Sequence, residues 1–391
     1  MLKIEKYDDL GQGIGRIDNK ICFVKRAIPE EIVDIHILKE KKNYLEAEIT
    51  KIISKSEKRV NPVCRFYDKC GGCNFLHTTS LEEKMFKIAR ANRFFSKMDY
   101  FYDTEDFYRN KIVLHVYKGK LGFFLEKTND LVEIDFCYLV NPKINEVIRF
   151  LKKTVDSSYT GKIVIRNNSL NETMVIIDSA YKNFEALKQS LLIDNLIIEN
   201  MIVKGKNYFI EHFQNYKFMI HDKSFFQVNR LGLEKVSLIL ENFLKDKKLD
   251  TILDLYSGTS VLGILVSKYC KKVISIEANK SATDDAKENL KLNHITNLKV
   301  INGLVEDYIE KFKNIDLVIV DPARRGLDLK TIKYLNKIKS SYIIYIACGI
   351  DSLRRDLEYF KNSYLIDKLY LVDMFKRTRD VETVAILKIK V

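Results

Sequence analysis

The segment Thr251–Ile264, TILDLYSGTSVLGI, constrains the fold of this chain more than any other feature. The apolar residues Ile252–Leu255 indicate a buried strand, a turn of small residues follows around Gly258, and Val261–Tyr269 has helical spacing. In doubly wound sheets this sequence of elements cradles a nucleotide-like ligand, because small residues let the backbone approach and the helix N–H groups face the ligand. We therefore expect an α/β Rossmann-like domain with a mostly parallel sheet.

An acidic residue supports this interpretation. The next predicted strand, Val273–Ile276, ends at Glu277, about 20 positions after the turn, where a carboxylate suits the hydroxyl groups of a ribose. The alternative is an ordinary strand-to-helix turn with a surface glutamate, because Ser260 stands where a second glycine is expected. The candidate cofactor-binding residues of this region are Asp254, Tyr256, Gly258 and Glu277.

Two later strands end in groups that can do chemistry. The apolar run Ile315–Val320 is followed by Asp321. Another run, Ser341–Ala347, is followed by Cys348. Ligands of open α/β sheets bind beyond the carboxyl ends of the strands, so we expect both side chains on the same rim as Glu277. A cysteine at such a position is either an inert packing residue or a nucleophile.

The N-terminal residues predict a different module. Residues 1–55 alternate like short strands, and the glycine-rich stretch LGQGIGRI is followed by no helical pattern, so it indicates a hairpin and not a phosphate-binding loop. We expect a small five-stranded β-barrel of the OB type, a fold that commonly binds nucleic acid. A barrel without any RNA contact is the alternative.

Three of the seven cysteines are clustered. Cys64, Cys70 and Cys73 have the spacing Cys-x5-Cys-x2-Cys, with two glycines between the last pair, and can converge on one metal centre. Both tetrahedral zinc and a cubane cluster need a fourth ligand. With His77 as that ligand the site would suit zinc, and with Cys137 it would suit an iron–sulfur cluster.

The charge and the hydropathy of the chain limit its possible partners and its cellular location. The formal net charge of +13 indicates a polyanionic partner such as nucleic acid, although a lysine-rich proteome would give the same excess. No apolar run has membrane-spanning length and the N-terminus lacks the apolar core of a signal peptide, so we expect a cytoplasmic protein without a membrane partner. We divide the chain into residues 1–55, a central α+β domain at 56–230, and the Rossmann-like domain at 231–391.

Several motifs, taken in order, resemble one known family. These are the clustered cysteines, SFFQVN (Ser224–Asn229), ILDLYSGTS, DPARRG (Asp321–Gly326) and DMFKRTRDVETVAIL (Asp373–Leu387). Over nearly the whole chain they are similar to the RNA uracil-5-methyltransferases that use S-adenosylmethionine (TrmA/RlmD-like), in particular the RlmD-like branch that modifies ribosomal RNA.

This resemblance implies a domain and ligand assignment. Residues 1–54 would form a TRAM domain, and Gln227 and Asp321 would contact S-adenosylmethionine. The four cysteines would hold an iron–sulfur cluster of the 4Fe-4S type: Cys64, Cys70, Cys73 and Cys137. The expected partner is 23S ribosomal RNA, with transfer RNA as the alternative, and we expect a monomer.

The resemblance also implies a mechanism. The C5 atom of uracil is too unreactive to take a methyl group unaided, so a thiolate must first add to C6. We expect Cys348 to be this nucleophile, Glu382 the base that removes the C5 proton, and Asp321 a group that orients the pyrimidine. Arg324 or Arg377 would lower the pKa of the thiol, and the target base would leave its stack.

The chain departs from the family pattern at three places. Ala347–Cys348–Gly349–Ile350 replaces Ser-Cys-Asn-Pro, Ser257 and Ser260 replace Cys and Gly in the cofactor loop, and Arg379 and Asp380 replace Gly-His near the end. Two other functions stay open on the sequence alone. One is an RNA-binding cluster protein with impaired catalysis, and the other is a methyltransferase that acts on a small molecule.

Overall fold

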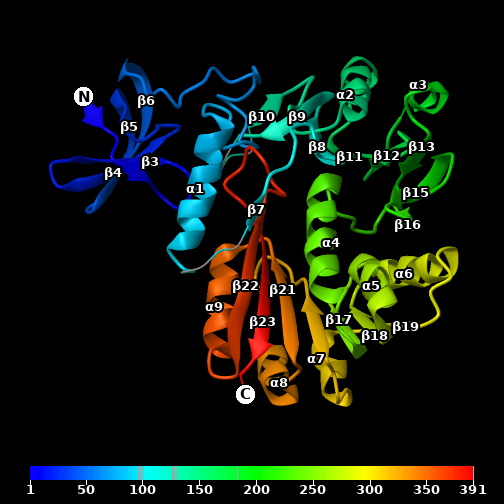
Figure 1. Ribbon diagram of the computed structural model, residues 1–391. Coiled ribbons are helices and arrows are strands. Elements are labelled where there is room, and N and C mark those ends of the chain that lie inside the picture. Colours follow the sequence, from blue (N-terminus) through cyan, green and yellow to red (C-terminus); the bar gives the residue numbers. More distant parts are fainter. Residues whose placement is uncertain (96–97, 99, 126–127, 129, 183, 391) are drawn as a thin grey trace. The chain divides into compact units, whose positions relative to one another are not determined.

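The structure of the protein, a computed structural model, describes residues 1–391 except 96–97, 99, 126–127, 129, 183 and 391. The chain forms two compact units (Figure 1). We call Met1–Ser96, Phe124–Val132 and Phe375–Val381 the N-terminal unit, and Lys97–Phe123, Glu133–Met374 and Glu382–Val391 the α/β unit. Residues near the C-terminus therefore complete the unit that begins at the N-terminus.

The N-terminal unit contains a six-stranded sheet in the order β1-β5-β6-β4-β3-β2. Its strands are β1 (Leu2–Lys3), β2 (Lys6–Tyr7), β3 (Gly13–Ile17), β4 (Lys20–Lys25), β5 (Ile32–Glu40) and β6 (Tyr44–Ser54). The glycine-rich stretch forms the antiparallel β3–β4 hairpin, as predicted. The sheet has six strands where five were expected, because β1 and β2 have two residues each and are too short to show a period.

A helix and the returning C-terminal segment complete this unit. Helix α1 (Ser80–Asn92) carries a buried ion pair in which Lys87 Nζ lies 2.7 Å from Glu83 Oε1. The same carboxylate oxygen accepts a hydrogen bond of 2.7 Å from the backbone N–H of Arg377. A carboxylate with both partners is stable in a buried place, so Glu83 fixes the segment Phe375–Val381 against α1.

The first part of the α/β unit is built on strands β8, β9 and β11–β14, which belong to one sheet. Their bounds are β8 (Lys111–Tyr117), β9 (Lys120–Phe124), β11 (Gly161–Asn167), β12 (Thr173–Ile177), β13 (Asn195–Ile198) and β14 (Met201–Lys204). Strand β10 (Leu131–Glu133) spans the boundary of the two units in the sequence. The accompanying helices are α2 (Pro142–Thr154) and α3 (Glu185–Gln189).

The second part is an eight-stranded sheet in the order β19-β18-β17-β20-β21-β23-β22-β7 (Figure 1). Its strands are β7 (Tyr100–Tyr102), β17 (Leu249–Leu255), β18 (Cys270–Glu277), β19 (Leu298–Asn302), β20 (Leu317–Val320), β21 (Tyr342–Ala347), β22 (Tyr364–Val372) and β23 (Glu382–Ile389). Strands β17–β21 are parallel, and β23 enters antiparallel between β21 and β22. The strand order reverses between β17 and β20, and ligands of open α/β sheets bind beyond the strand ends at such a reversal.

Helices connect the strands of this sheet. They are α4 (Arg230–Leu244), α5 (Val261–Val266), α6 (Lys280–Leu292), α7 (Val305–Tyr308), α8 (Leu329–Ile338) and α9 (Ile350–Phe360), with short 3-10 turns at Ser267–Tyr269 and Ile309–Lys311. No helix in the described part of the chain is long and apolar enough to cross a membrane.

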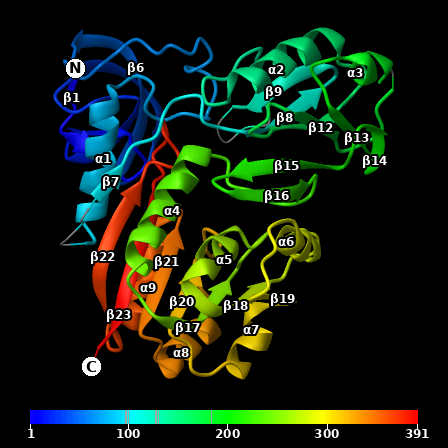
Figure 2. The same cartoon turned by 45° about the vertical axis from the view of Figure 1, so that its right-hand side comes forward.

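A hairpin joins the two parts of the α/β unit. Strands β15 (Tyr208–Phe213) and β16 (Tyr216–His221) pair with each other, and β16 runs along α6 (Figure 2). The amide oxygen of Asn289 on α6 accepts a hydrogen bond of 2.6 Å from the backbone of Met219, and Asp285 bonds the backbone and the ring of His221. Side chains of α6 thus satisfy the edge of β16, and this fixes where the segment Ser224–Asn229 begins.

Candidate functional site

The turn after β17 is held in an unusual backbone conformation. Tyr256, Gly258 and Ser260 have φ angles of 59°, 54° and 56°, so three of five successive residues are left-handed. Only glycine adopts this conformation without strain. A Cβ atom placed on Gly258 would meet no other atom within 4 Å, so the backbone borders open space. The loop therefore exposes its main chain to a ligand.

The parallel register of β17 and β18 pairs Leu255 with Ile276 and so places Glu277 beside this loop. Its Oε2 atom accepts a hydrogen bond of 2.9 Å from the N–H of Gly258, and its Oε1 atom accepts one of 2.7 Å from the N–H of Asn279. The carboxylate is thereby fixed in orientation. Each oxygen has a second lone pair, which leaves capacity for the hydroxyl groups of a ribose.

Asp254 is buried within the same region. Its Oδ2 atom accepts a hydrogen bond of 3.0 Å from the hydroxyl of Ser275. Its Oδ1 atom and the hydroxyl groups of Ser257 and Ser260 are buried without a hydrogen-bond partner in the described structure. Burial raises the pKa of Asp254 to about 7, and repulsion by Asp321 adds to the effect. Buried polar atoms are normally paired, so this group fits a polar ligand that completes the hydrogen bonds.

Tyr256, another candidate, directs its phenol away from the loop. The hydroxyl lies 3.2 Å from Oδ2 of Asp328 and 3.4 Å from the hydroxyl of Thr331, at the start of α8. Burial, together with the Asp328 charge, raises the pKa of this phenol. Tyr256 can thus contact a ligand through its backbone and ring, whereas its hydroxyl fixes the loop to α8.

The three catalytic candidates lie at neighbouring strand ends. Asp321 follows β20, Cys348 follows β21, and Glu382 is the first residue of β23. Strands β20 and β21 are parallel neighbours, and β21 pairs antiparallel with β23 through Ala347 and Thr383. The next position of this register sets Cys348 opposite Glu382. The structure therefore brings these candidates together.

These groups also influence one another electrostatically. Burial raises the pKa of Cys348 to about 11, and the charges of Glu382 and Asp321 add to the effect, while Arg324 opposes it. Burial also raises the pKa of Asp321 to about 7. Arg324 thus acts in the predicted direction, but the net effect is opposite to the lowered thiol pKa that we expected. Arg377 belongs to the N-terminal unit, where its side chain lies 3.9 Å from Glu83.

Gln227 lies in the segment between β16 and α4. The side-chain amide of Asn110 donates a hydrogen bond of 3.0 Å to the backbone oxygen of Gln227, and Asn229 caps α4 by accepting from Gly232 N–H at 3.0 Å. Asn110 thus positions Gln227, a role that the sequence did not reveal because 117 positions separate the two residues. Only a structure or covariation data could have found this pair.

The candidate metal ligands fall in both units. Cys64, Cys70 and Cys73 are half-buried in the N-terminal unit, and Cys70 Sγ accepts a hydrogen bond of 3.4 Å from the N–H of Gly72. Cys137 belongs to the α/β unit, where Asn145 bonds both its N–H and its carbonyl group. In the described residues no group of three or more His, Cys, Asp or Glu side chains is arranged to hold a metal ion. The four-thiolate set therefore stays a prediction.

His77, the fourth ligand in the zinc alternative, is buried between aromatic rings. Its Nδ1 atom lies 2.6 Å from the hydroxyl of Tyr67, and its ring stacks on those of Tyr67 and Phe75. Burial lowers the pKa of His77 to about 3, so the ring is neutral at physiological pH. These contacts pack His77 into the N-terminal unit, while its Nε2 atom is buried without a hydrogen-bond partner in the described structure.

The fold and the rim of polar groups define a class, the Rossmann-like transferases that bind a nucleoside cofactor beyond the strand ends. Residues 185–390 match the family described as tRNA (Uracil-5-)-methyltransferase, and residues 2–50 match the TRAM domain. An uncharacterized RNA methyltransferase of Clostridium acetobutylicum is 30% identical over 98% of this chain and 96% of its own length. One from Fusobacterium nucleatum is 30% identical over 100% and 96%.

A solved structure has the same fold. The tRNA (uracil-54, C5)-methyltransferase of Pyrococcus abyssi, in complex with S-adenosyl-L-homocysteine, matches with a TM-score of 0.79 and 24% identity. The match covers 99% of this chain and 100% of that one. The chain belongs to the S-adenosylmethionine-dependent RNA (uracil-5-)-methyltransferases. The predicted Rossmann-like methyltransferase domain with an N-terminal TRAM domain is confirmed.

Proposed function

We propose that this enzyme forms 5-methyluridine in 23S ribosomal RNA by covalent catalysis, with Cys348 as nucleophile and Glu382 as base. The observation that carries the proposal is the placement of this thiol opposite this carboxylate, at strand ends next to Asp321. A small-molecule methyltransferase would have no use for a TRAM domain, which residues 2–50 match. A protein without catalysis would have no use for a thiol and a carboxylate brought together at the rim.

The first step is attack of the Cys348 thiolate on C6 of uracil, which forms a C–S bond and moves the C5=C6 electron pair toward C5 and O4. In the free enzyme the thiol pKa of about 11 leaves this residue almost fully protonated at neutral pH. The thiol proton must therefore pass to a base when RNA binds. Asp321, whose pKa burial raises to about 7, lies near enough to interact with the thiol and suits this transfer.

The second half of the reaction removes a proton and restores the ring. Once C5 has taken the methyl group, it still carries its hydrogen, and Glu382 accepts that proton while the C5=C6 bond re-forms and the thiolate leaves. Glu382 is only 3% exposed, so its carboxylate is shielded from bulk water. The thiol proton is thus assigned to Asp321 and the C5 proton to Glu382, and the electron pair of the broken S–CH3 bond would stay on the sulfur of the methyl donor, which leaves as a thioether.

S-adenosylmethionine fits the loop after β17. The three buried polar atoms without partners, of Asp254, Ser257 and Ser260, and the open space at Gly258 match a polar nucleoside ligand. We assign Glu277 to its ribose, and Gln227 and Asp321 to its other end nearest the rim. When bound, this cofactor supplies an electrophilic methyl group on a sulfonium centre. Its positive charge would also lower the thiol pKa of Cys348.

The choice of ribosomal RNA rests on the cysteines. The resemblance of Cys64, Cys70, Cys73 and Cys137 to the cluster ligands of the ribosomal RNA branch supports 23S RNA. Transfer RNA is the second candidate, because the matching family and the Pyrococcus abyssi enzyme both carry transfer RNA in their names. We place the activity in the cytoplasm, where both RNAs occur, and expect a monomer.

For the same cysteines we propose a 4Fe-4S cluster. Four thiolates are the donor set that such a cluster takes, and a backbone N–H that bonds Cys70 Sγ is a contact that stabilises a thiolate. Zinc with His77 is the alternative, because Nδ1 of this ring bonds Tyr67 but its Nε2 atom has no hydrogen-bond partner in the described structure. The methyl transfer needs no change of redox state, so the cluster would serve structure or RNA binding.

The test uses the covalent intermediate. With Glu382→Gln and S-adenosylmethionine present, the C5 proton cannot be removed, so a protein–RNA adduct should accumulate and survive denaturing electrophoresis. The adduct should be absent from the double variant Cys348→Ala, Glu382→Gln. Failure of Glu382→Gln to form the adduct on RNA that the wild-type enzyme methylates would count against the role of Glu382.

A further inference from the structure

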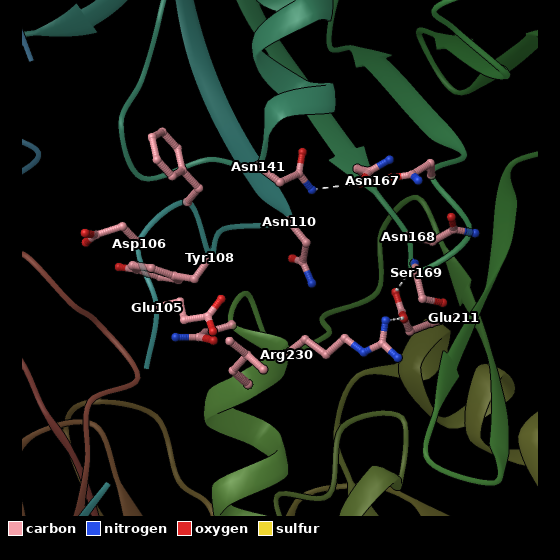
Figure 3. A pocket seen from close by; sticks show the side chains of 14 residues that line it. Glu105, Asp106, Tyr108, Asn110, Asn141, Asn167, Asn168, Ser169, Glu211 and Arg230 are labelled. Carbon is pink, nitrogen blue, oxygen red and sulfur yellow. Dashed lines mark hydrogen bonds and ion pairs between the residues drawn. The ribbon is translucent and has the colours of Figure 1, made fainter. Parts of the chain in front are cut away.

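The α/β unit contains a second polar cavity outside the rim of Cys348. Its volume is about 280 Å³, and its walls come from the residues before β8, the start of α2, the end of β11, strand β15 and the start of α4 (Figure 3). Asn110 and Asn229 line it, and these residues flank the cofactor segment through their bonds to Gln227 and to α4. The cavity therefore lies next to the segment Ser224–Asn229, which carries Gln227.

Several amide groups in the wall are engaged in the fold. Asn141 caps α2 by accepting from Ile144 N–H at 2.9 Å and donates to Asn167 at 2.7 Å. Asn168 donates to the backbone oxygen of Ile210 at 2.9 Å and accepts two backbone N–H groups. These amides form a rigid frame and have little capacity left for a ligand.

Glu211, by contrast, has unused capacity. Its side chain is only 3% exposed, and its Oε2 atom accepts a hydrogen bond of 3.2 Å from the N–H of Ser169. Its Oε1 atom is buried without a hydrogen-bond partner in the described structure, and the nearest cation, Nη1 of Arg230, is 4.0 Å away. Figure 3 shows Glu211 and Arg230 pointing toward each other in the cavity. Nε of Arg230 is also buried without a hydrogen-bond partner.

A buried carboxylate oxygen without a hydrogen bond is costly, so a ligand that donates a hydrogen bond here is favoured. The adjacent guanidinium adds a donor for an acceptor on the same ligand. The cavity therefore presents an acceptor and a donor side by side. Phe107 also lines the cavity, and its ring packs against those of Phe136 and Tyr138, with centroids 6.4 and 4.5 Å apart.

We propose that this cavity binds a guanine base of the RNA substrate, separate from the target uridine, through Glu211 and Arg230. The proposal rests on the proposed function, because it supplies a second anchoring point for the RNA that is methylated. Guanine fits best among the bases because its Watson–Crick edge carries two donors, N1–H and the N2 amine, directly beside the acceptor O6. Glu211 would accept from the donors and Arg230 would bond O6. Uracil offers one donor only on the same edge.

The first test measures mononucleotide binding to the full chain by saturation-transfer NMR. GMP, IMP and UMP carry the same phosphate, so their differences report the base, and saturating S-adenosylhomocysteine blocks the cofactor site. We expect GMP to bind at least about tenfold more tightly than UMP, and more tightly than IMP, which lacks the N2 amine. Equal affinity for the three, or no binding of GMP, would overturn the proposal.

The matched variants are Glu211→Gln and Glu185→Gln. In Glu211→Gln the carbonyl oxygen can still accept from Ser169, so the fold is kept, but the NH₂ group turns the acceptor into a donor. The preference for GMP should disappear in this variant and in Arg230→Gln, and it should persist in Glu185→Gln, which loses the same charge on the exposed face of α3. A preserved preference in Glu211→Gln would sink the idea.

The second test separates this inference from the proposed function. Methyl transfer to total RNA from a strain that lacks this protein should show a KM about 10- to 100-fold higher for Glu211→Gln, with kcat little changed. An unchanged KM would overturn the guanine site and leave the methyl transfer intact. If the wild-type enzyme transfers no methyl group, the proposed function fails, and the mononucleotide experiment still decides whether the cavity binds guanine.

Discussion

Cys348 stands opposite Glu382 at the point where two antiparallel strands part, one position beyond the paired residues Ala347 and Thr383. The charge of the carboxylate helps burial to raise the thiol pKa to about 11. In the mechanism proposed above, Cys348 is the nucleophile and Glu382 the base, and a protonated thiol would not react before substrate arrives. The thiol would thus be unreactive in the free enzyme, and the binding of substrate and cofactor would have to favour the thiolate.

Alkylation of Cys348 tests this relationship. Removal of the carboxylate charge in Glu382→Gln should lower the thiol pKa, so iodoacetamide should modify Cys348 about 3- to 10-fold faster at pH 8, even though methyl transfer is lost. Mass spectrometry of the modified peptide gives the rate. Cys270 is an internal reference, because burial raises its pKa to about 11 without any contribution from Glu382. A Cys348 rate that stays the same in Glu382→Gln contradicts the electrostatic coupling.

The loop after β17 makes a prediction about stability. Ser260 is left-handed, with φ of 56°, and its buried hydroxyl has no partner in the described structure. Ser260→Gly should therefore raise the free energy of unfolding by about 1 kcal/mol. Gly258→Ala, at φ of 54°, should lower it by about 1 kcal/mol and also weaken S-adenosylmethionine binding, because its methyl group would enter the open space. Urea titration and calorimetry measure both quantities. Equal stabilities of the two variants would show that the loop is not strained.

The sequence predicted the local parts of this site, and the structure supplied the distant ones. The strand, turn and helix around Gly258 and the strand that ends at Glu277 follow from short patterns of apolar and small residues. The raised thiol pKa could not be predicted, because it depends first on burial and then on the charge of Glu382, which the antiparallel pairing of β23 with β21 brings near. Hydrophobic periodicity reveals that a strand exists but not which strands it joins. The buried oxygen of Glu211 was missed for the same reason.

Glu277 should control affinity for the cofactor. Its carboxylate accepts hydrogen bonds from the backbone N–H groups of Gly258 and Asn279. Glu277→Ala therefore leaves these two N–H groups without their acceptor and removes the carboxylate that is proposed to bind the ribose. We expect the dissociation constant for S-adenosylmethionine to rise about 10- to 100-fold in calorimetry. Glu288→Ala, which removes a carboxylate from the partly exposed side of α6, is the control and should bind normally. Normal binding by Glu277→Ala would exclude the ribose assignment.

The raised pKa of Asp254 predicts that the stability of the fold depends on pH. Its folded-state pKa of about 7 lies above the usual carboxyl value of 3.8, so the folded state binds more protons than the unfolded state between these values. Stability therefore falls as pH rises from about 4 to about 7, by about 4 kcal/mol at most for this group. Asp254→Asn mimics the neutral form and should show a flatter profile in urea titrations at pH 5, 6, 7 and 8. Identical slopes for the variant and the wild-type enzyme would rule out this assignment.

Transfer of a labelled methyl group from S-adenosylmethionine to total RNA tests the central claim most directly, with the RNA taken from a strain that lacks this protein. The wild-type enzyme should produce 5-methyluridine in the 23S fraction, and Cys348→Ser, which keeps the size of the side chain but not the thiol, should produce none. Label in the transfer RNA fraction instead would identify transfer RNA, the second candidate, as the substrate. Undiminished 5-methyluridine formation by Cys348→Ser would contradict the covalent mechanism.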